Sequence, residues 1–163
     1  MDAIECLKTR RSVRQFRRDP VPDEVVADLV DCGRLAPTGR GVQPWDFIVV
    51  RDPAVRAQLA AMCEYGKFIA DAPVCIIVVC EDTKYYIEDG SAATTCILLA
   101  ARAHGLGSCW VAGDKKPYAN EVCDLLGCPP THRLVSLIAV GYTDQCPTPT
   151  KRPLESVMHS ERF

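Results

Sequence analysis

A cluster of basic side chains near the start of the chain is the first feature whose residue types could do chemistry. Residues 8–18 contain six positive side chains and no negative one, although the whole chain carries a formal net charge of -2. The guanidinium groups of Arg10, Arg11 and Arg14 can each bind phosphate oxygens in pairs. The hydroxyl of Ser12 can donate to the same oxygens. The cluster therefore predicts a phosphate site, and a basic solvated surface is the alternative that composition leaves open.

A loop rich in proline and glycine forms the second candidate, between residues 36 and 45. It holds two prolines and two glycines ahead of Trp45. Because glycine has no side chain, such a loop can bring backbone amides close to a flat ligand. We interpret it as a candidate binding loop, and an ordinary turn is the alternative.

A third glycine-rich segment, residues 105–113, leads out of a predicted helix and into a predicted strand. This order is the reverse of the dinucleotide motif Gly-x-Gly-x-x-Gly, which follows a strand and opens a helix. The chain contains no P-loop motif either. A Rossmann domain and a P-loop enzyme are therefore disfavoured.

The ten cysteines and three histidines predict no metal site. No two cysteines are separated by two residues, so neither a zinc site nor a Cys-x-x-Cys redox pair is indicated. The histidines are scattered and suggest no catalytic triad. Most cysteines lie among apolar neighbours, so we expect reduced thiols that pack as small hydrophobic groups.

Length and composition indicate one globular domain over residues 1–163, because 48% of the residues are hydrophobic and 25% are charged. Charged residues interrupt the segment after Met1, so no leader is indicated. The apolar runs 74–80 and 96–101 are too short to span a bilayer. We therefore expect a cytoplasmic protein with no membrane partner.

Hydrophobic periodicity predicts four strands and five helices. The strands are expected at 45–50, 74–80, 108–112 and 134–142, and the helices at 2–9, 23–35, 54–63, 87–104 and 118–126. Strands and helices alternate without a strict repeat. This pattern predicts an α+β fold with a central mixed β-sheet of four to five strands flanked by helices.

The helix predicted at 87–104 is small or apolar on nearly every face. One domain of this size cannot easily cover such a helix, which favours a core shared with a second subunit. A purely internal core helix is the alternative. The tail 143–163 is too polar to form its own core, so we expect it to pack on a surface, that of the partner subunit.

These motifs, in this order, resemble those of the nitroreductase family of FMN-dependent oxidoreductases, in a compact form. The motifs that carry the resemblance are Arg10-Arg11-Ser12-Val13-Arg14, Ala36-Pro37-Thr38 with Gln43-Pro44-Trp45, Gly105-Leu106-Gly107-Ser108-Cys109-Trp110, and Lys151-Arg152. The resemblance implies a homodimer with two FMN sites at the subunit interface. It also implies a ping-pong reaction in which NADH or NADPH reduces FMN and a small acceptor, such as a nitroaromatic or a quinone, reoxidises it.

The family pattern also implies which residues bind the cofactor. Arg10, Arg11 and Ser12 would hold the phosphate and ribityl chain, and Arg14 would lie near the pyrimidine edge of the flavin. The remaining implied contacts are Pro37, Thr38 and Gly39 from the partner subunit, Trp110, Ala112 and Gly113 along the other side of the ring, and Lys151 or Arg152 at the phosphate. No catalytic side chain is implied, because the flavin carries the chemistry.

Two positions depart from the family pattern, and two tryptophans have another interpretation. The family often has asparagine where Gly41 stands and serine where Thr38 stands. For Trp45 and Trp110, packing in the core is the alternative to flavin contact.

Two other functions fit parts of the sequence. A non-catalytic flavin-binding redox carrier or sensor would need the same phosphate site. A nucleic-acid-binding module could use the basic run, but the chain is slightly acidic overall and no aromatic platform accompanies the arginines. We therefore expect no nucleic-acid partner.

Overall fold

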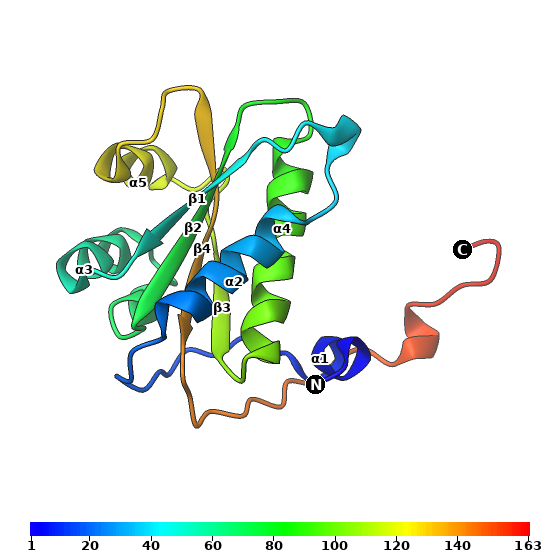
Figure 1. Cartoon of the computed structure of the whole chain (residues 1–163). Coiled ribbons are helices and arrows are strands. Elements are labelled where there is room, and N and C mark those ends of the chain that lie inside the picture. Colours follow the sequence, from blue (N-terminus) through cyan, green and yellow to red (C-terminus); the bar gives the residue numbers. More distant parts are fainter.

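The computed structural model describes every residue, 1–163, and arranges helices on both faces of one β-sheet (Figure 1). The strands are β1 (Trp45–Val50), β2 (Val74–Glu81), β3 (Gly107–Ala112) and β4 (His132–Gly141). The helices are α1 (Ala3–Thr9), α2 (Asp23–Arg34), α3 (Pro53–Met62), α4 (Tyr86–Ala103) and α5 (Ala119–Leu126). Three short 3-10 turns are η1 (Gly39–Gly41), η2 (Lys67–Ile69) and η3 (Leu154–Ser156).

The four strands lie in the order β1-β2-β4-β3, and every neighbouring pair is antiparallel. The predicted α+β class and the four strands are confirmed, but the prediction of a mixed sheet is wrong. A helix between strands often marks a parallel crossover. Here α3 and η2 instead return the chain to β2 in the opposite direction. The one parallel contact is an isolated bridge between Ser12 and Ser108.

Strand β2 shows why the sheet needs helices on both faces. Its residues from Val74 to Cys80 are all buried, and alternate side chains point to opposite faces. Ile76 and Val78 pack with α2 and α4, whereas Cys75 and Ile77 pack with α3 and α5. A continuous apolar run is typical of parallel sheets, and covering both faces of an antiparallel sheet produces the same pattern.

Helix ends follow local sequence signals, and the predicted helices are confirmed to within a residue or so. The side chain of Asp2 accepts from the amide of Glu5 and caps α1. Asp52 caps α3 in the same way, with Pro53 as its first residue. Gly127 ends α5 in the left-handed conformation that glycine adopts without steric cost.

Helix α4 buries one broad face against the sheet and α2, but it is not covered all round within one chain. Its outer stripe recurs at helical spacing and consists of Glu88, Ala92, Thr95, Leu99 and Arg102, of which Glu88 and Thr95 are exposed and the others half-buried. We call these five residues the outer stripe of α4. Its middle is small or apolar, which is unusual for a face turned to water.

Two further apolar surfaces are uncovered in the single chain. Ile4 and Leu7 of α1 are each more than half exposed. The segment after β4 runs away from the body of the domain (Figure 1), and it carries exposed Leu154, Val157 and Met158. Such surfaces mark places where another chain can pack.

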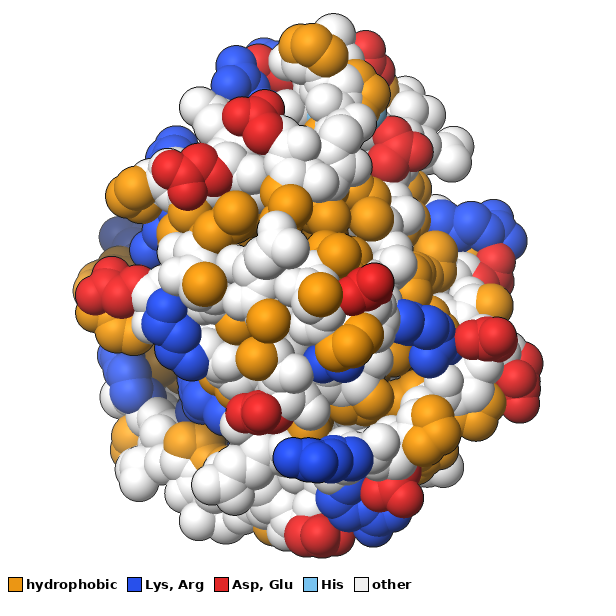
Figure 2. Space-filling view, turned by 90° about the vertical axis from the view of Figure 1, so that its left-hand side faces the viewer, with side chains coloured by type: hydrophobic (Ala, Val, Ile, Leu, Met, Phe, Trp, Pro, Cys, Tyr) orange, Lys and Arg blue, Asp and Glu red, His pale blue; other side chains and the backbone are white.

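The opposite side of the molecule, over α3 and α5, looks different. Figure 2 shows that hydrophobic, acidic and basic side chains are intermixed on this face.

None of the helices combines the length and the apolar composition that a membrane-spanning helix needs.

Candidate functional site

The candidate site lies along the free edge of strand β3. Strand β3 lies at the end of the sheet, and its inner side pairs with β4. The carbonyl of Ser108 accepts from the amide of Val13 on the outer side. Because backbone groups alternate along a strand, the amides of Trp110 and Ala112 point to this same outer side. They are available to a ligand lying along the edge.

Gly113 is placed differently from Trp110 and Ala112. Its amide donates to the carbonyl of Val135, at 3.0 Å, so it continues the pairing with β4. A side chain at this position would meet Leu134 at 2.5 Å. Gly113 therefore lets the end of β3 pack closely against Leu134. The last amide of β3 that is free to meet a ligand is that of Ala112.

A pocket of about 250 Å³ at the start of β3 gathers basic side chains. Arg10 and Arg11 line it from the amino-terminal segment, and Arg102 lines it from the last turn of α4. The lining residues include one acidic side chain, Asp144. None of the three arginines forms an ion pair in the chain. We call this the arginine pocket, and its charge suits a phosphate.

A second pocket, of about 530 Å³, lies farther along the same edge and is lined mainly by apolar and aromatic groups. Its walls include Phe68, Trp110, Ala112 and Tyr118. The hydroxyl of Tyr118 donates to the carbonyl of Ala112 and fixes this end of the strand. We call it the aromatic pocket, and its composition suits a flat ring system.

Ser12 and Arg14 lie where the two pockets meet. Ser12 bridges to β3 at Ser108, and Arg14 donates its backbone amide to the side chain of Gln145 at 2.9 Å. The guanidinium of Arg14 lies over the ring of Phe68, 5.9 Å from its centroid. The arginine pocket includes Ser108 and the aromatic pocket includes Cys109, so the two pockets contact successive residues of β3. We call the two pockets and the β3 edge together the groove, with a cationic end and a flat end.

The loop that carries Pro37, Thr38 and Gly39 lies elsewhere in the chain. Thr38 and Gly39 donate to the carboxylate of Asp89, at 2.9 and 2.8 Å, and Asp89 is almost fully buried near the start of α4. Arg102 lies thirteen residues later on this helix, roughly 20 Å away at 1.5 Å per residue. The loop and the arginine pocket therefore occupy opposite ends of α4 (Figure 1).

Lys151 and Arg152 are not brought into the arginine pocket of their own chain. Both are exposed on the tail, and the pocket ends at Pro147. Arg152 donates to the carbonyl of Ser156 at 2.6 Å.

Sequence reasoning missed residues that only the folded chain brings to the groove or to the loop of Thr38 and Gly39. Arg102 could have been noticed as the basic residue at the end of a helix that precedes a glycine turn. Phe68 and Tyr118 carry no local signal. Asp89 contacts a loop fifty residues earlier, so neighbouring sequence could not reveal it.

Cys109 lies beside the groove, and its chemistry can be tested. Burial raises the pKa of its thiol, although Arg14 nearby acts in the opposite direction. A thiol kept protonated is a poor nucleophile. We therefore expect Cys109→Ser to leave turnover within a few fold while the cofactor stays bound, as measured by steady-state kinetics and flavin absorbance. Loss of turnover with full cofactor content would contradict a packing role.

No group of three histidine, cysteine, aspartate or glutamate side chains is arranged to hold a metal ion.

The fold and the groove together are those of an α+β protein that can hold an elongated ligand with an anionic end and a flat end. Comparisons with known proteins identify the family.

A sequence model of the nitroreductase family matches residues 7–64 and 60–142. A protein of Methanothermobacter thermautotrophicus, provisionally named an NADH dehydrogenase/NAD(P)H nitroreductase, is 34% identical over 153 residues, which cover 90% of this chain and 80% of that protein. The chain belongs to the nitroreductase family. The predicted family and the predicted class of enzyme, an oxidoreductase, are confirmed.

Solved structures agree with this assignment. A protein of Parabacteroides distasonis with the same provisional name superposes with a TM-score of 0.94 at 28% identity, covering 99% of this chain and 98% of that one. A provisionally named nitroreductase of Desulfovibrio desulfuricans, solved in complex with FMN, has a TM-score of 0.89 at 29% identity and covers 100% and 98%.

Proposed function

We propose that the chain is a cytoplasmic, homodimeric NAD(P)H oxidoreductase that binds FMN along the free edge of β3. The observation that carries the proposal is the groove, in which a cationic pocket and an aromatic pocket contact neighbouring residues of the free edge of β3. FMN has the matching parts, a phosphate at one end and a flat ring system at the other. An FMN-dependent nitroreductase of Clostridium difficile and the FMN complex of the Desulfovibrio desulfuricans protein, which have similar structures, support the same cofactor.

Each part of the groove has a task in holding FMN. Arg10, Arg11 and Arg102 bind the phosphate, and their charge is not used by carboxylates of the chain. The amide of Ala112 donates to the flavin ring from the strand edge. Arg14 presents a cation to the ring at the point where the pockets meet, which favours the electron-rich state of the cofactor.

A second subunit supplies what one chain lacks. Pro37, Thr38 and Gly39 lie too far from the arginine pocket to reach the same FMN from one chain, as the length of α4 between them requires. The outer stripe of α4 and the exposed apolar groups of α1 and the tail offer the surface for a twofold partner. In the dimer the loop of one subunit closes the aromatic pocket of the other, and Lys151 or Arg152 reaches a phosphate.

When bound, FMN would supply the hydride chemistry between NADH or NADPH and a small acceptor, in ping-pong order. The chain contributes binding, orientation and charge. The acceptor is a small reducible compound such as a nitroaromatic or a quinone, small enough to lie on the ring in the aromatic pocket.

FMN is expected to copurify with the protein, and Arg10→Ala is expected to weaken FMN binding by about 1.5 to 3 kcal/mol, the scale of a hydrogen bond to a charged group. Titration of the apoprotein followed by flavin fluorescence measures the change. Arg34→Ala is the matched control, because Arg34 pairs with Asp31 on α2, outside the groove. Equal FMN affinity in wild type and Arg10→Ala would refute the phosphate placement.

A flavin-binding carrier or sensor would share this groove, so turnover must be measured as well. Steady-state oxidation of NADH or NADPH with a quinone acceptor separates the two functions. An enzyme oxidises many equivalents of reductant per FMN, whereas a carrier stops after one.

A further inference from the structure

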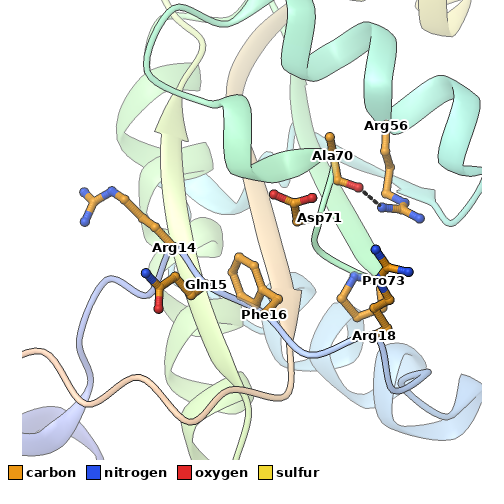
Figure 3. A pocket seen from close by; sticks show the side chains of 8 residues that line it. All are labelled: Arg14, Gln15, Phe16, Arg18, Arg56, Ala70, Asp71 and Pro73. Carbon is orange, nitrogen blue, oxygen red and sulfur yellow. Dashed lines mark hydrogen bonds between the residues drawn. The ribbon is translucent and has the colours of Figure 1, made fainter.

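A third pocket, of about 540 Å³, lies outside the cofactor groove and is lined mainly by polar and charged groups (Figure 3). Its lining residues are Arg14, Gln15, Phe16, Arg18, Arg56, Ala70, Asp71 and Pro73. The lining residues include three arginines and a single carboxylate, so they carry an excess of two positive charges. The FMN site uses none of Arg18, Arg56 and Asp71.

Arg56 is the most constrained of these arginines, because it is only 9% exposed. Its Nη1 donates to the carbonyls of Ala70 and Ala72, and its Nε lies 3.4 Å from the carbonyl of Arg51. No carboxylate lies within ion-pairing distance of it. A buried cation normally has an anionic partner, and here the partner is missing from the chain.

Arg18 adds a second cation without an internal partner. It is exposed and forms no ion pair, unlike the adjacent Arg17, which pairs with Asp19 and Asp144. In Figure 3, Arg18 and Arg56 line the same end of the pocket, and Asp71 lies between them and Arg14. Two guanidinium groups at one end form a site for a strongly anionic group such as a diphosphate.

This pocket adjoins the aromatic pocket. Arg14 lines both. Phe16 of one pocket and Phe68 of the other stand in contact, with ring centroids 6.4 Å apart. A molecule placed with one end on the flavin ring could therefore extend past Arg14 into the pocket of Arg18 and Arg56.

We propose that Arg18 and Arg56 form a subsite for the diphosphate of the nicotinamide dinucleotide that reduces the flavin. The inference rests on the proposed function, because it assigns the reductant to the aromatic pocket. The diphosphate is common to NADH and NADPH, so the subsite binds both and discriminates against reductants without phosphates.

Arg18→Gln is the test variant, because Arg18 is exposed and its replacement leaves the fold intact. Arg17→Gln is the matched control, an equal loss of charge one residue away. In FMN-loaded protein, stopped-flow reduction by NADH is expected to need a roughly tenfold higher half-saturating concentration in Arg18→Gln, as for one lost hydrogen bond to a charged group. Reoxidation by an uncharged quinone, after reduction with dithionite, should be unchanged.

Calorimetric titration with ADP, and with adenosine as its uncharged counterpart, probes the pocket without turnover. ADP should bind wild type more tightly than adenosine does, and Arg18→Gln should abolish the difference. Asp71→Asn, which removes the carboxylate, should tighten ADP binding by about two- to threefold, the size of an exposed charge effect.

The outcomes separate the subsite from the proposed function. Equal NADH dependence in Arg18→Gln and Arg17→Gln, or a change confined to the quinone step, would overturn the subsite. If neither NADH nor NADPH reduces the FMN bound to the wild-type protein, the proposed function would be overturned instead. In that case ADP binding decides whether the pocket is a phosphate site. Equal binding of ADP and adenosine to wild type would refute a phosphate site.

Discussion

Thr95→Glu is expected to yield folded monomers that have lost FMN. Thr95 lies at the centre of the outer stripe of α4 and is exposed within one chain, so the charge does not disturb the fold of a subunit. In the proposed dimer the same carboxylate would be buried without a partner, which costs several kcal/mol. Because each FMN in the proposed site needs groups from two chains, dissociation should release the cofactor as well.

Light scattering and flavin absorbance measure the two effects together, and circular dichroism reports the fold. Gln58→Glu on the exposed side of α3 introduces the same charge away from the stripe and should leave dimer and FMN intact. A folded monomer that still binds FMN tightly would contradict the two-chain site. If Thr95→Glu forms a dimer as stable as that of the wild type, the outer stripe of α4 is not part of the interface.

Asp89→Ala is expected to lower the free energy of unfolding by about 3 kcal/mol, because two hydrogen bonds to a charged group are lost. The buried carboxylate holds the hydroxyl of Thr38 and the amide of Gly39. Thr38 in turn accepts from the amide of Gln43 at 3.0 Å, so one side chain fixes the whole loop. Release of the loop should also weaken FMN binding, since in the proposed dimer this loop closes the ring site of the partner.

Urea denaturation and FMN titration check the two consequences of Asp89→Ala separately. Asp89→Asn should have a smaller effect, because its amide oxygen can still accept from Gly39. Asp124→Ala removes an exposed carboxylate on α5, away from the loop and from the outer stripe of α4, and serves as the control. Lower stability with unchanged FMN affinity would show that the loop does not contribute to the cofactor site.

The elements of the fold were predictable wherever the signal was local. Asp52-Pro53 marks the start of α3, and the apolar run of residues 74–80 marks β2, both within a residue of the observed bounds. The direction of pairing was not predictable in this way. A run buried on both faces and a helix between strands suggest parallel pairing, and the antiparallel return depends on how α3 and η2 pack.

The candidate site was predictable only in part, for the same reason. The arginines of residues 10–14 and the glycine turn before β3 are short motifs that sequence can display. Arg102 and Asp89 act across long separations, and their roles follow from the position of α4. The uncovered side of α4 is another case: its composition indicated a buried helix, but only the structure shows that Ala93 faces the internal core and Thr95 faces outward.

The free edge of β3 has a consequence for the protein without its cofactor. An open strand edge with unpaired amides, such as those of Trp110 and Ala112, is a template on which a strand of another molecule can pair. Trp110, 36% exposed, adds apolar area to that edge. A ligand bound along β3 blocks this template, so loading with the cofactor also protects the molecule from aggregation through its sheet.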